Sequence, residues 1–201
     1  MHLVVLTWPY ALIFWAVFTW AFVPEFVKWT LVPEFVKRRN EGRATPQDAN
    51  SKRVLIIAQT FGMAAAFTIA STVPFGALSY SMLFFWVGVV ALIAGGLLRR
   101  HCWRMLGSSF TGAVIVNADQ AVVERGAYRF VRHPSYTAAV ILFLGIGLAL
   151  ANWISLATLL VLVFMAFLYR VNVEERALVD VIGDPYRNYM QRTKRFIPCV
   201  F

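Results

Sequence analysis

The sequence predicts an all-α integral membrane protein with five transmembrane helices. Its charged residues form a few short clusters, and the stretches 54–98 and 134–169 contain no Asp, Glu, Lys or Arg. A solvated helix needs charged side chains every few residues, whereas one charge near the centre of a bilayer costs at least ~2.5 kcal/mol. The composition, 60% hydrophobic and 15% aromatic, also fits a chain surrounded largely by lipid.

Five spans follow from the lengths of these uncharged stretches. About twenty apolar residues cross the hydrocarbon core, so each long stretch is divided into two crossings. The first divides at the turn-prone segment around Pro74 and Gly76, and the second at Asn152. An aromatic-rich N-terminal segment supplies one more span. The predicted spans are residues 3–23, 54–71, 78–98, 136–150 and 154–169, within a single membrane domain that covers residues 1–201.

The basic residues predict the orientation of the spans. They lie between the first and second spans, between the third and fourth, and after the fifth, and these regions share one side of a five-span protein. The positive-inside rule makes that side cytoplasmic, with the N-terminus external and the C-terminus cytoplasmic. The net charge of +9 is then explained by contact with anionic membrane lipids, so no nucleic-acid partner is expected. The two cysteines, Cys102 and Cys199, lack metal-type spacing, and no metal is expected.

Polar side chains gather where the fourth and fifth spans meet the cytoplasm. A tight hairpin joins these two spans, so His133 and Tyr136 are expected close to Arg170 and Glu174. Arg170 and Glu174 are four residues apart and share one face of a helix. Beyond them, Gly183 is expected to end a helix, and Asp184 to be the N-cap of a short new one. That helix would lay Tyr186 and Tyr189 over the mouth of the hairpin.

Three motifs in this half of the chain resemble a known family. The pattern G-x-Y-x-x-x-R-H-P-x-Y occupies residues 126–136, and E-E-x-x-L-x-x-x-x-G-x-x-Y-x-x-Y occupies residues 174–189. A final R-x-I-P follows at residues 195–198. Together they resemble the isoprenylcysteine carboxyl methyltransferase family, integral membrane enzymes related to the phospholipid N-methyltransferases. The resemblance covers roughly the C-terminal half and implies a catalytic core at about residues 99–198.

The resemblance also implies a cofactor and a pocket. The cofactor would be S-adenosylmethionine, leaving as S-adenosylhomocysteine, and the acceptor a lipophilic substrate that enters from the bilayer. The pocket would lie on the cytoplasmic side, between the loop before the fourth span and the C-terminal helices. Arg170 would face the carboxylate of the acceptor. The residues expected to bind the cofactor are Gln120, Ala121, Val122, Val123, Tyr128, His133, Pro134, Ser135, Tyr136, Glu174 and Glu175.

The sequence leaves alternative functions open. A carboxylate acceptor fits Arg170 and needs no general base, because the methyl group of a sulfonium is already activated. A phospholipid amine or another lipophilic N- or S-acceptor is the alternative, and a protonated amine would need His133 or Glu175 to accept a proton. A small transporter or an assembly factor is the non-enzymatic alternative. It is disfavoured because the five spans contain no acidic or basic side chain.

Overall fold

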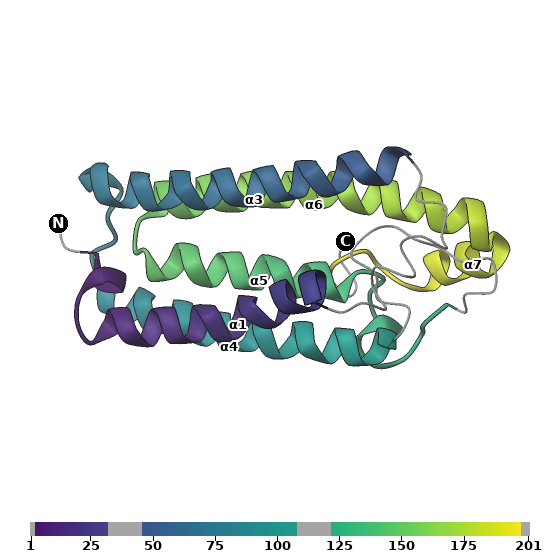
Figure 1. Cartoon of the computed structure of the whole chain (residues 1–201), viewed down its shortest axis with the longest axis horizontal. Helices are drawn as coiled ribbons and strands as arrows, with labels where there is room; N and C mark the ends of the chain where they lie inside the picture. Colours follow the sequence, from purple (N-terminus) through teal and green to yellow (C-terminus); the bar gives the residue numbers. More distant parts are fainter. Residues whose placement is uncertain (1–2, 32–45, 108–121, 198–201) are drawn as a thin grey trace.

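The computed structural model describes residues 3–31, 46–107 and 122–197, and its regular elements within these ranges are helices. Five helices with apolar stretches run alongside one another (Figure 1). They are α1 (Tyr10–Leu31), α3 (Pro46–Thr72), α4 (Ser81–Leu106), α5 (Pro134–Ala149) and α6 (Trp153–Ile182).

Each of these helices coincides with one predicted span. By length and composition, three segments could cross a membrane, namely Asn50–Thr72, Ser81–Leu106 and Trp153–Ile182. Tyr10–Pro24 and Pro134–Ala149 are shorter apolar helices. The all-helical membrane fold is thereby confirmed, whereas the number of crossings stays a prediction.

Several helix ends differ from the boundaries of the predicted spans, which as membrane crossings stay a prediction. α1 begins at Tyr10, directly after Pro9, instead of at residue 3, and a short 3₁₀ helix, η1 (Val4–Leu6), precedes it. α3 begins at Pro46 rather than at residue 54, and α6 continues to Ile182 instead of ending at residue 169. A run of apolar residues marks the part of a helix that suits lipid, but the backbone hydrogen bonds continue into the polar region.

The most extensive helix contacts are those of α4 with α5 and of α3 with α6. α3 lies along α6, α1 lies along α4, and α5 contacts both α4 and α6 (Figure 1). The backbones of α4 and α5 touch, since a Cβ added at Gly88 would lie 2.5 Å from the carbonyl oxygen of Gly145. Small residues permit such close helix packing where lipid supplies no hydrophobic driving force. Phe85, Leu142 and Phe167 are almost fully buried in the apolar core of the bundle.

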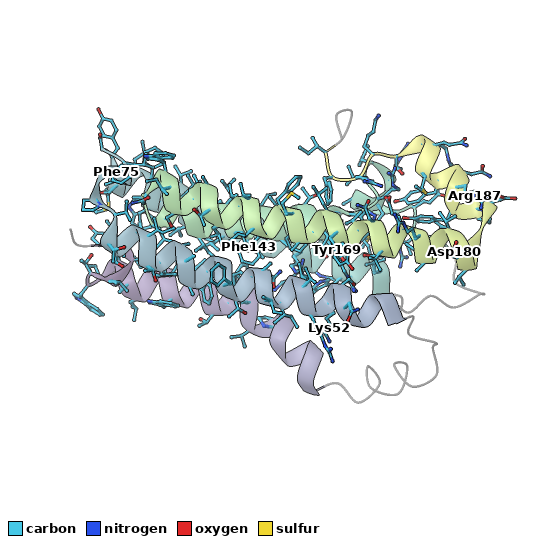
Figure 2. All side chains as sticks on the ribbon, turned by 90° about the horizontal axis from the view of Figure 1, so that it is seen from above. Lys52, Phe75, Phe143, Tyr169, Asp180 and Arg187 are labelled. Carbon is cyan, nitrogen blue, oxygen red and sulfur yellow. The ribbon has the colours of Figure 1, made fainter. Side chains whose placement is uncertain are left out.

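The two short connections are tied together at one end of the bundle. Asn152 caps α6, because its Oδ1 accepts hydrogen bonds from the backbone N–H groups of Ile154 and Ser155, each at 3.1 Å. Its Nδ2 donates to the carbonyl oxygen of Val73 at 2.9 Å. Both predicted turns are confirmed, and they lie at the end where α1 begins (Figure 1), which Phe75 marks in Figure 2.

The predicted topology can be tested with reporter fusions. Fusions after Arg53, Arg104 and Phe201 should all report a cytoplasmic location, and a fusion near Pro74 an external one, because the basic clusters favour the cytoplasm. The measurement is paired alkaline phosphatase and fluorescent-protein activity in cells. A cytoplasmic signal near Pro74 would contradict the five-span model.

Candidate active site

Three segments of the chain meet at the end of the bundle opposite the Asn152 turn. They are the loop that carries η4 (Gly126–Arg129), the first turn of α5, and the last turns of α6. A short helix, α7 (Asp184–Arg192), folds back against α6 at this end (Figure 1). Figure 2 shows the labelled charged residues Asp180 and Arg187 at the same end.

Gly126 lets the loop approach α4 closely. Its φ of +61° is the left-handed conformation that L side chains rarely adopt, and an added Cβ would lie 3.0 Å from His101 Nε2 and from the side chain of Met105. Two residues later, Tyr128 is 6% exposed. Its hydroxyl is buried without a hydrogen-bond partner in the part of the chain that the structure describes. A buried hydroxyl of this kind is a candidate ligand for a bound molecule.

Tyr136 joins the two residues of α6 that the sequence singled out. Its hydroxyl donates to Glu174 Oε2 at 2.7 Å and accepts a hydrogen bond from Arg170 Nε at 3.4 Å. Arg170 is buried, with 4% of its surface exposed, and Glu174 is half-buried. The expected meeting of the α5 and α6 ends is therefore present in atomic detail.

Glu175 is the centre of a buried ionic cluster. Its Oε1 accepts from Arg132 Nε at 2.9 Å and lies 3.2 Å from His133 Nε2, while its Oε2 accepts from Arg195 Nη2 at 2.7 Å. The carboxylate is 3% exposed. A buried carboxylate without a partner would be strongly destabilising. Here the two guanidinium groups compensate the free-energy cost of its burial. Both oxygens of Glu175 are engaged inside the chain.

Residues 193–196, which we call the C-terminal strap, complete this end of the protein. The backbone N–H of Arg132 donates to the carbonyl oxygen of Lys194 at 2.7 Å, and that of His133 donates to the carbonyl oxygen of Arg195 at 3.0 Å. The Arg132 side chain adds a hydrogen bond to the carbonyl oxygen of Met190 at 3.0 Å. Backbone hydrogen bonds therefore join the strap to the R-H-P segment. The two segments are also linked through Glu175, which accepts from Arg195 of the strap and from Arg132.

The fold-back after α6 is confirmed, with one correction. Gly183 ends α6 with a φ of +72° and is itself the N-cap of α7, so the assignment of Asp184 as the N-cap was wrong. The Asp184 carboxylate instead forms an exposed ion pair with Arg187 at 3.3 Å. Tyr189 is buried and its hydroxyl donates to the carbonyl oxygen of Tyr128 at 2.6 Å. Burial raises the pKa of Tyr189 to about 12, so the hydroxyl keeps the proton that it donates.

The structure adds two residues to this end that the sequence argument missed. Arg99 of α4 is 9% exposed; its Nη1 donates to the carbonyl oxygen of Ser135 at 2.8 Å. The sequence could have indicated Arg99, because Trp103 follows it by one helical turn and an aromatic ring there can bind a cation. In the structure, the guanidinium of Arg99 lies 5.6 Å from the centroid of the Trp103 ring. Ser51 of α3 is fully buried and its Oγ accepts from Arg170 Nη1 at 2.6 Å. No sequence signal distinguished Ser51 from the other polar residues around it.

The predicted site residues lie as follows. Gln120 and Ala121 are outside the described residues, and Val122 and Val123 are half-buried in the segment before η4. The remaining residues surround the meeting point of α5 and α6. Of these, the buried ones are Tyr128, His133, Pro134, Arg170 and Glu175, and the half-buried ones are Ser135, Tyr136 and Glu174.

Comparison with known proteins agrees with this geometry. The model of the isoprenylcysteine carboxyl methyltransferase (ICMT) family matches residues 86–180, the segment that contains most of α4, the η4 loop, α5 and nearly all of α6. Residues 86–180 are thus similar to the isoprenylcysteine carboxyl methyltransferase family. The resemblance seen in the sequence motifs is confirmed.

Relatives and a solved structure give the extent of the likeness. The protein-S-isoprenylcysteine O-methyltransferase of Schizosaccharomyces pombe is 33% identical over 111 residues, covering 54% of this chain and 47% of that protein. Form B of Arabidopsis thaliana is 32% identical over 115 residues, covering 56% of this chain and 58% of that protein. The solved structure of a eukaryotic intramembrane Ras methyltransferase of this family superposes with a TM-score of 0.57 at 25% identity, over 72% of this chain and 52% of that one. The chain thus spans about half the length of these relatives.

Proposed function

We propose that this integral membrane protein transfers the methyl group of S-adenosylmethionine to a carboxylate on a lipophilic acceptor that enters from the bilayer. One observation carries the proposal: Tyr136 links the buried guanidinium of Arg170 to the carboxylate of Glu174 at the polar end of an apolar bundle. An anion-binding and a cation-binding group are thereby held side by side. The O-methyltransferase names of the relatives support the same reaction.

The described residues fit such a cofactor. S-adenosylmethionine carries a cationic sulfonium, an ammonium group and several hydrogen-bonding groups, so it suits a carboxylate beside a donor hydroxyl. Glu174 would hold a cationic part, and the unpartnered hydroxyl of Tyr128 would gain a hydrogen bond. His133, Pro134, Ser135 and Tyr136 would line the pocket from the start of α5, and residues 120–123 would border it. We place the catalytic core at about residues 99–198, on the cytoplasmic side.

The main task of the protein in this reaction would be to align the acceptor with the methyl group of the cofactor. When bound, the cofactor would supply a methyl group that its positively charged sulfur activates, and this sulfur would leave as a neutral thioether when the methyl group passes to the acceptor oxygen. Arg170 would orient the acceptor carboxylate, because a planar guanidinium binds a carboxylate through two parallel hydrogen bonds. α7 and the C-terminal strap would exclude water from the reacting groups, since Tyr189 of α7 and Phe196 of the strap are both buried.

The ionic cluster favours a carboxylate over an amine as the acceptor. A protonated amine has to lose a proton before it can attack, and Glu175 and His133 are the candidate acceptors for that proton. Both Glu175 oxygens are already engaged by Arg132, His133 and Arg195. A carboxylate so strongly paired is a poor proton acceptor, whereas a carboxylate substrate needs none.

The proposal is tested by labelling. Purified protein in lipid vesicles is incubated with methyl-tritiated S-adenosylmethionine and either N-acetyl-S-farnesylcysteine or phosphatidylethanolamine. Base-labile label on the farnesylcysteine is expected, because a methyl ester releases methanol in base. Base-stable label on the phospholipid would replace the carboxylate reading with N-methylation, and no label on either would refute methyl transfer to these two acceptor classes.

Replacing Arg170 with lysine should separate acceptor binding from cofactor binding. Arg170 meets Tyr136 and Ser51 through two different nitrogen atoms, Nε and Nη1, and the single ammonium of lysine cannot keep both contacts. Methyl transfer is expected to fall at least tenfold, or ~1.4 kcal/mol in the barrier, while cofactor affinity stays close to wild type. Turnover and S-adenosylhomocysteine calorimetry give the two readings. Arg104→Lys, an exposed change in the last turn of α4, is the matched control. Equal turnover in both variants would contradict the proposal that Arg170 orients the acceptor.

A further inference from the structure

α3 reaches the candidate site although it lies outside the family segment at residues 86–180. It does so because the helix begins at Pro46, so its first turns continue past the apolar run and lie alongside the polar turns of α6. Figure 2 labels Lys52 and Tyr169, the sequence neighbours of Ser51 and Arg170, at the same level of the paired helices. α3 therefore contributes a side chain to the site.

The contribution is the hydroxyl of Ser51. It is fully buried and accepts a hydrogen bond from Arg170 Nη1 at 2.6 Å. On another edge of the same guanidinium, Nε donates to Tyr136 at 3.4 Å. Because a guanidinium is planar and rigid, two contacts in different directions fix the orientation of its plane.

We propose that Ser51 is a positioning residue that fixes the orientation in which Arg170 meets the acceptor, and so contributes to acceptor binding. The inference rests on the proposed function, in which Arg170 orients a carboxylate. Ser51 acts through Arg170 and has no part in the transfer of the methyl group. Its influence on the cofactor would have to pass through Tyr136 to Glu174, so the effect on acceptor binding is expected to be the larger.

The chain provides a matched control for this contact. Ser155 of α6 is also fully buried, and its Oγ donates to the carbonyl oxygen of Ala66 in α3 at 2.8 Å. Ser51→Ala and Ser155→Ala each remove one buried hydroxyl that joins α3 to α6. Only the first touches Arg170, so any general loosening of the helix pair should appear in both variants.

The experiment compares the steady-state kinetics of wild type, Ser51→Ala and Ser155→Ala with N-acetyl-S-farnesylcysteine, alongside calorimetry with S-adenosylhomocysteine. We expect the acceptor KM of Ser51→Ala to rise about fivefold, as for one lost hydrogen bond of ordinary strength. Its cofactor affinity should stay within about twofold of wild type. On the free-energy scale, a twofold change is less than half of the fivefold change expected for the acceptor. Ser155→Ala should match wild type in both constants while losing a similar amount of thermal stability.

Each other outcome has a defined meaning. An unchanged acceptor KM in Ser51→Ala, or an equal rise in both variants, would overturn the positioning role while the proposed function stands. A loss of cofactor affinity as large as the rise in KM would overturn it as well, because the effect would not be specific to the acceptor. Failure of the wild-type protein to methylate the farnesylcysteine would refute the carboxylate-acceptor reading, and the inference with it.

Discussion

Replacing Glu175 with alanine is expected to lower the free energy of unfolding by about 3–5 kcal/mol, the usual cost of removing one partner from a buried ion pair. The change would leave Arg132 and His133 next to an empty space, with both groups still largely buried. It would also release Arg195, and with it one of the contacts that hold the C-terminal strap. The loss of stability should appear as a large fall in the thermal unfolding midpoint of the protein in detergent.

An exposed ion pair in α7 supplies the control. Asp184→Ala removes the partner of Arg187, but both side chains are mostly exposed, at 85% and 61%. Such a pair contributes at most about 1 kcal/mol, so the unfolding midpoint should hardly move. Similar shifts in the two variants would show that the Glu175 cluster is not a source of stability.

Glu174→Ala is expected to weaken the binding of S-adenosylhomocysteine by about 1.5–3 kcal/mol, the value of a hydrogen bond to a charged group. The product retains the ammonium group of the cofactor, so it still reports on a carboxylate in the pocket. Calorimetry with the protein in detergent measures the affinity directly. Wild-type affinity in this variant would mean that the cofactor is held elsewhere.

The choice of Glu174 for this test follows from its neighbours. His133→Ala should weaken binding by a similar amount, but His133 also contacts Glu175, so its loss would disturb the buried cluster as well. Glu174 is half-buried and accepts from Tyr136, which lies outside that cluster. Asp180→Ala, which removes an exposed carboxylate farther along the same helix, is the matched control and should leave the affinity unchanged.

Most of the fold could be predicted from the pattern of charge. Lipid excludes charge so strongly that the uncharged stretches locate all five helices and the two turns between them. The helix ends could not be found in this way, as α3 and α6 show, because nothing in the polarity of a residue stops backbone hydrogen bonding. The apolar pattern therefore located the lipid-facing part of each helix and missed the polar turns that build the candidate site.

The site was predictable only where local spacing carried the information. Arg170 and Glu174 share a helix face, and the hairpin brings Tyr136 to them, as the structure confirms. Ser51 could not be found because its role depends on contact between residues that are 119 positions apart. The sequence placed both glutamates at the cofactor, but it held no sign that Arg195 would return to engage Glu175.

The C-terminal strap has a consequence for the way the protein is made. Arg132 pairs with Thr193, 61 residues later in the chain, so the R-H-P segment leaves the ribosome well before its partner. At ordinary rates of translation, about 5–20 residues per second, the delay is roughly 3–12 s. During that interval α5 and α6 can insert and pack, while water must satisfy the backbone N–H groups of Arg132 and His133. A nascent chain interrupted before residue 193 would therefore carry the membrane helices but leave the backbone N–H groups of Arg132 and His133 hydrated.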